Sequence, residues 1–104
     1  MDNDVYIREI NKPSLDAFAQ AVNDEEAGGT SFVKSSVEWY DNAFVNLAVF
    51  RFLDPPGTLV TGPVQLVKHG QAAPPGAASV WRGVVVVDGV NQAVTLYRSA
   101  GGGA

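Results

Sequence analysis

The chain has 104 residues, a length at which a single domain with one hydrophobic core is expected. Its net charge of −4 and its lack of any basic cluster argue against nucleic acids and anionic membranes as partners. It has no cysteine and one histidine, His69, which excludes disulfides, thiolate chemistry and the common structural zinc sites within one chain.

The first part of the chain predicts a short strand over residues 4–10 and then an amphipathic helix. Ser14 or Pro13 can begin this helix, and four apolar residues then recur at helical spacing: Leu15, Phe18, Ala19 and Val22. Gly28 and Gly29 predict that the helix ends near residues 23–27. The acidic residues there oppose the helix dipole, so a frayed, solvated end is expected at Asp24, Glu25 and Glu26.

Two strands joined by a turn are predicted next. Residues 31–40 alternate between apolar and polar side chains, which places Val33, Val37 and Trp39 on a buried face. Asp41 and Asn42 form the turn, and residues 43–53 return as a strand that is apolar on both faces. The alternative for this region is one helix over about residues 36–53.

The sequence of residues 54–57, Asp-Pro-Pro-Gly, predicts a break in regular structure. Residues 58–69 then show weak alternation interrupted by Pro63, which is typical of an edge strand. Residues 70–78, which contain Pro74 and Pro75, predict a semi-rigid loop.

The last two strands, over residues 80–87 and 90–97, are predicted to form a hairpin around Asp88-Gly89, a preferred type I′ pair. In that register Val87 lies opposite Val90, and Trp81 lies opposite Leu96. The face shared by these pairs is the apolar one. The opposite face, which includes Arg82, Val84 and Val86, is still too apolar for a solvated surface and is expected to be covered.

These elements together predict an α+β domain in which one N-terminal amphipathic helix packs on an antiparallel sheet of about five strands. The single domain covers residues 1–104, with a Gly-rich tail over 99–104. The acidic start of the chain and the absence of an apolar run longer than four residues predict neither a secretory signal nor a membrane span. A soluble protein in the cytoplasm, or within a virion, is the expectation.

Charge is distributed unevenly along the chain: residues 1–54 carry fourteen charged side chains and residues 55–104 carry only four. A surface this poor in charge is expected to be covered by another molecule. We therefore expect a non-enzymatic assembly or interaction protein that is homo-oligomeric or part of a larger assembly, such as a phage or virus structural or accessory protein. The expected interface comprises the C-terminal tail and Arg82, Val84, Val86, Thr95, Tyr97, Pro74 and Pro75.

Two other functions stay open at this point. One is a small ligand-binding protein or enzyme with an aromatic pocket lined by Trp39, Phe44, Phe50 and Trp81, and with Glu38, Asp41 or His69 as the acid–base group. The other is an acidic inhibitor that meets a basic partner through Asp24, Glu25 and Glu26. No catalytic, phosphate-binding or metal-binding motif is present, so the sequence predicts no catalytic residue, no cofactor and no metal site.

Overall fold

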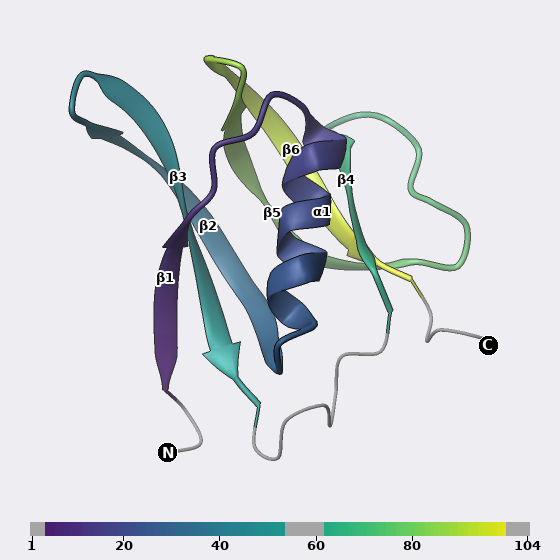
Figure 1. Ribbon diagram of the computed structural model, residues 1–104. Coiled ribbons are helices and arrows are strands. Elements are labelled where there is room, and N and C mark those ends of the chain that lie inside the picture. The colour runs from purple at the N-terminus through teal and green to yellow at the C-terminus, as the bar shows by residue number, and fades with distance from the viewer. Residues whose placement is uncertain (1–3, 54–61, 100–104) are drawn as a thin grey trace.

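The computed structural model describes residues 4–53 and 62–99. Within them, one helix and six strands follow one another in an α+β fold that is mostly sheet (Figure 1). Their order is β1 (Val5–Glu9), α1 (Leu15–Glu26), β2 (Thr30–Tyr40), β3 (Ala43–Phe52), β4 (Val64–Lys68), β5 (Ala78–Val87) and β6 (Val90–Arg98). The predicted break at residues 54–57 and the tail at 100–104 lie outside the described residues.

The prediction of one sheet with about five strands is wrong. The strands form two three-stranded antiparallel sheets, in the orders β1-β3-β2 and β4-β6-β5. Strands β2 and β5 lie beside each other without a shared hydrogen-bond ladder. Each carries a bulge, at Val33 in β2 and at Val80 in β5. A bulge bends its strand and increases the local twist, which works against a continuous ladder between the two edges.

Both predicted hairpins are confirmed. Asp41 and Asn42 adopt φ angles of 52° and 65°, and Asp88 and Gly89 adopt 50° and 77°, as a type I′ turn requires. In the second hairpin Val87 pairs with Val90, and the pairing continues in the predicted register to Trp81 opposite Leu96. The strand interpretation of residues 43–53 is also confirmed, because β3 is the central strand of the first sheet.

Helix α1 begins as predicted, with the Ser14 side chain accepting a hydrogen bond from the Ala17 N–H at 3.1 Å. The helix packs mainly on β4 and also meets β2, so it lies over the space between the sheets (Figure 1). Its apolar stripe meets residues of both sheets in one core, whose fully buried members include Phe18, Val22, Phe50, Val85, Val94 and Leu96.

The predicted buried face of β2 is partly wrong because of the bulge. Phe32 and Ser35 are buried, whereas Val33, the extra residue of the bulge, is 36% exposed. Trp39 is 62% exposed because it lies near the turn of the β2–β3 hairpin, beyond the body of the molecule. Alternation read from the sequence does not reveal either effect, since a bulge shifts the side-chain parity without a change in composition.

Candidate interaction surface

Three aromatic side chains are exposed at the end of the β2–β3 hairpin. Trp39 and Tyr40 are 62% and 67% exposed, and Phe44, across the turn, is 48% exposed. The rings of Trp39 and Phe44 meet edge to face, with centroids 4.8 Å apart. Figure 1 shows this end of the hairpin reaching away from α1. We call Trp39, Tyr40 and Phe44 the aromatic arm.

An open groove of about 600 Å³ separates the aromatic arm from the turn of the β5–β6 hairpin. Tyr40 and Phe44 line one side, Asp88 and Gly89 line the other, and Lys12 of the β1–α1 connection contributes as well. The groove also contains the carboxylates of Glu9 and Asp41, so acidic side chains outnumber the one lysine among its lining residues.

A buried asparagine holds the two sheets together beside this groove. Asn46 of β3 is fully buried, and its Nδ2 donates to the carbonyl oxygens of Ile10 at 3.0 Å and Val86 at 2.7 Å. Its Oδ1 accepts from the Val86 N–H at 2.9 Å. The amide therefore bonds both the N–H and the C=O of Val86, on the side of β5 that faces away from β6. These bonds fix β5 relative to β3 at the base of the groove.

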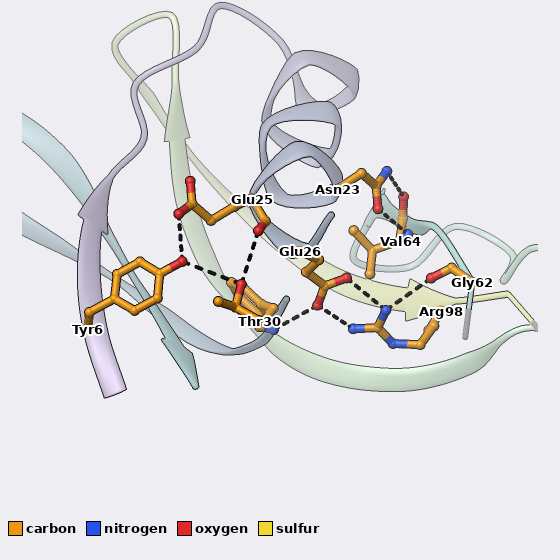
Figure 2. Close-up of polar contacts among 9 residues, drawn as sticks. Tyr6, Asn23, Glu25, Glu26, Thr30, Gly62, Val64 and Arg98 are labelled. Carbon is orange, nitrogen blue, oxygen red and sulfur yellow. Dashed lines mark hydrogen bonds and ion pairs between the residues drawn. The ribbon is translucent and has the colours of Figure 1, made fainter. Parts of the chain in front are cut away.

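The opposite edge of the second sheet is also bonded by an asparagine side chain. Asn23 of α1 donates from Nδ2 to the Val64 carbonyl at 3.2 Å and accepts from the Val64 N–H at 2.7 Å (Figure 2). Val64 is the first residue of β4, which is the opposite edge strand of that sheet. Asparagine side chains thus occupy positions along both edges where another strand could otherwise bind.

Two of the three predicted acidic-patch residues are engaged inside the molecule. Glu26 is 2% exposed and forms a two-pronged ion pair with Arg98, with N–O distances of 2.8 and 2.7 Å (Figure 2). Its Oε2 also accepts from the Phe32 N–H at 2.7 Å. The expectation of a solvated helix end is therefore wrong at Glu26, because Arg98 compensates the charge that opposes the helix dipole. Asp24 is exposed.

Glu25 binds two residues of β1. Its carboxylate accepts from the Tyr6 hydroxyl at 2.5 Å and from Arg8 Nε at 3.1 Å (Figure 2 shows the Tyr6 contact). The hydrogen bond from Tyr6 is the main reason that the pKa of Glu25 lies below its usual value. Desolvation, followed by the bond to Glu25, raises the pKa of Tyr6. Both effects keep the pair in one state, a neutral phenol beside a carboxylate.

The residues of the predicted interface are divided between the surface and the interior. Arg82 and Val84 are exposed, while Thr95 and Tyr97 of β6 are half-buried. Val86 is 5% exposed and its peptide group is bonded to Asn46. Val86 is therefore covered by other residues of the same chain, as part of the core, and is not available to a neighbouring molecule. In the loop, Pro74 is half-buried and Pro75 is exposed.

The four aromatic residues of the predicted pocket lie in two separate places. Phe50 is fully buried and contacts Phe32, which in turn meets Trp81 with ring centroids 5.6 Å apart. Trp39 and Phe44 lie together in the aromatic arm. Phe44 and Phe50 are six residues apart on one strand, which corresponds to about 20 Å. These four side chains therefore do not line a common pocket.

The predicted acid–base candidates all lie at the surface. His69, Glu38 and Asp41 are all exposed, and Nε2 of His69 lies 2.7 Å from Nη2 of Arg82 on the outer face of the second sheet. The bonds of Asn23 and Asn46 to strand edges were not predicted from the sequence. Only the positions of the turns indicate where the hairpins end.

Across residues 4–53 and 62–99, no group of three or more His, Asp or Glu side chains is placed to hold a metal ion. The helix found in these same ranges is too short to cross a bilayer. Comparison with known protein families, curated proteins and solved structures gives no significant match to this chain.

Proposed function

We propose that the protein is a non-enzymatic assembly protein that binds neighbouring subunits, a further copy of its own chain being the expected partner. The role is that of a structural or accessory subunit, as in a phage or virus particle. The observation that carries this proposal is the aromatic arm, in which Trp39, Tyr40 and Phe44 are exposed on a hairpin that reaches away from the core.

Aromatic side chains at the centre of an interface contribute large contact area at a low cost in conformational entropy. The arm is also built to keep its shape. The Asp41-Asn42 turn fixes the hairpin, and the contact between Trp39 and Phe44 orders both rings before binding. A surface ordered in advance loses less entropy on association. The groove next to the arm provides a concave surface for a neighbouring subunit.

The proposal is tested by sedimentation velocity over a concentration series. The wild-type chain is expected to associate, and Trp39→Ser with Phe44→Ser is expected to weaken association by about tenfold or more. Val80→Ser is the matched control, since Val80 is 38% exposed on β5, away from the arm. Loss of association only in the Val80 variant would place the contact on the outer face of the second sheet instead.

A further inference from the structure

In the described part of the chain, no strand pairs with the outward edge of β1. The Phe52 N–H donates to the Asp4 carbonyl and the Ile10 N–H donates to the Asn46 carbonyl, so the even-numbered residues of this segment bond to β3. In an antiparallel ladder the residues between them direct their N–H and C=O groups to the opposite side. Val5, Ile7 and Glu9 therefore present backbone donors and acceptors to the outside.

This edge differs from the other strand edges of the molecule. Asn23 and Asn46 each bond the outward N–H and C=O of one residue, Val64 in β4 and Val86 in β5, and β2 lies beside β5. Among residues 4–53 and 62–99, no hydrogen bond reaches the outward backbone groups of β1. Figure 1 shows β1 as the outermost strand of its sheet. An uncovered edge of this kind is a template for another strand.

Two apolar side chains of β1 are exposed as well. Val5 and Ile7 are 55% and 62% exposed, and they share one face of the sheet with their cross-strand partners Arg51 and Val49. A neighbouring strand would cover these two apolar side chains, which lie on the outer face of the first sheet.

The sequence of β1 is complementary to itself when it is read antiparallel about Tyr6. In that register Val5 lies opposite Ile7 of the second copy, and Asp4 lies opposite Arg8. The pair of Val5 and Ile7 falls on the positions whose backbone groups point outward, so each such pair forms two main-chain hydrogen bonds. A register centred on Arg8 would instead place two arginines opposite each other, which is destabilising.

We propose that β1 pairs antiparallel with β1 of a second copy, about a two-fold axis at Tyr6. This pairing joins the β1-β3-β2 sheets of the two copies into one six-stranded sheet. This inference rests on the proposed function, because it names a contact through which the chain self-associates. The contact is isologous, since each copy contributes the same strand. The aromatic arm lies outside it and is left free to bind further subunits.

Cysteine cross-linking tests the register, because the natural chain contains no cysteine. Val5→Cys and Ile7→Cys proteins are mixed under mild oxidation. Hydrogen-bonded pairs in antiparallel strands have Cα atoms about 5.5 Å apart, within the range of a disulfide. The mixed dimer is expected to exceed the dimers of either variant alone, and Gln65→Cys, exposed on β4, is the control for random collision.

Two results of the cross-linking would overturn the proposed pairing. Preferential dimers of Ile7→Cys with itself would indicate a register centred on Ile7. The second result is a monomeric wild-type chain whose Val5→Cys and Ile7→Cys variants cross-link no faster than Gln65→Cys. It would overturn the proposal of a second copy and indicate that a strand of a different protein binds this edge.

Ile7→Pro tests the edge itself. Proline at this position removes an outward N–H and preserves the hydrogen bonds of β1 to β3, whereas Ile7→Thr preserves the N–H. We expect Ile7→Pro to weaken dimerisation by at least about tenfold, and Ile7→Thr to weaken it much less. Asp4→Arg, at an exposed position, is the second variant if Ile7→Pro does not fold, and it is expected to weaken dimerisation several-fold.

The two proposals fail in different ways. A wild-type chain that stays monomeric at every concentration contradicts self-association altogether. The other case is a wild-type chain that associates, with association lost in the arm variants but unchanged in Ile7→Pro and Asp4→Arg. That result contradicts only the pairing of β1.

Discussion

Asn23 and Asn46 have equivalent roles on opposite edges of the second sheet: each primary amide bonds both the N–H and the C=O of one strand residue. Asn23 binds Val64 of β4 from the helix, and Asn46 binds Val86 of β5 from the first sheet. A side-chain amide has the same donor and acceptor groups as a peptide bond and can therefore take the place of a neighbouring strand. At these two positions a side chain, and not a fourth strand, bonds the edge of the second sheet.

Asn46→Asp is expected to destabilise the protein by about 3 kcal/mol or more at neutral pH. The carboxylate still accepts from the Val86 N–H, but it loses the two hydrogen bonds to the Ile10 and Val86 carbonyls and faces their oxygens instead. A protonated carboxyl restores one donor, so the loss of stability should be smaller at low pH. Urea unfolding at several pH values checks this, and a variant that is equally unstable at all pH values would contradict it.

Glu26→Gln is expected to lower the free energy of unfolding by about 3–5 kcal/mol. The substitution leaves Arg98, whose side chain is 14% exposed, without the opposite charge that compensates its burial. Asp24→Asn is the matched control, because Asp24 is exposed on the same helix and should change stability by less than about 0.5 kcal/mol. Chemical denaturation of both variants measures the difference, and similar values for the two would contradict the role of the buried pair.

The contact between Tyr6 and Glu25 predicts a decrease in stability at both ends of the pH range. The folded-state pKa of Tyr6 is raised above 10.0, so its stabilising effect is present below that value and is lost as the pH rises through the raised pKa. The pKa of Glu25 is lowered below 4.5, so its effect is present above that value and is lost as the pH falls through the lowered pKa.

Tyr6→Phe should remove the alkaline decrease, weaken the acid one and destabilise the protein by about 1.5 kcal/mol at neutral pH. Thermal unfolding across the pH range measures all three effects. Tyr40→Phe is the control, since Tyr40 is exposed on the aromatic arm. An unchanged pH profile in Tyr6→Phe would show that the hydroxyl contact does not contribute.

Gly83 lies beneath the ring of Trp81, so a side chain there has no room. A Cβ atom at position 83 would lie 2.3 Å from an indole carbon. Gly83→Ala should therefore displace Trp81 from its contact with Phe32 and cost about 1–3 kcal/mol. Tryptophan fluorescence in a Trp39→Phe background reports the displacement.

Gly28→Ala is the control for Gly83→Ala, because its nearest neighbour would be at 3.4 Å, an ordinary contact distance. Equal stability of Gly83→Ala and the wild-type chain, with unchanged fluorescence, would contradict this account of the glycine.

Local signals in the sequence predicted the hairpins and the helix. The Asp88-Gly89 turn and the alternation on either side determine the register of β5 and β6, since a shift of one residue would expose Val85 and Val87. Ser14 likewise caps the start of the helix, and Gly29, with a φ of 101°, lies just beyond its C-cap at Ala27, because capping depends on neighbouring residues.

The features that the sequence did not reveal depend on contacts between distant segments. Glu26 and Arg98 are 72 residues apart, and Asn46 and Val86 are 40 apart, so neither relation leaves a periodic pattern. The exposure of Trp39 depends on how far β2 and β3 extend beyond their neighbours. Aromatic residues at strand spacing look the same in sequence whether they lie in a core or on an arm.

The Val86 N–H of the second sheet donates to Asn46 of the first sheet. The contact between the two sheets, and not either hairpin, therefore protects this proton from solvent. Its exchange with deuterium therefore requires the sheets to move apart, while both turns can remain closed. The groove beside the aromatic arm widens in that same movement. One backbone amide thus reports how often the molecule opens where we expect a neighbour to bind.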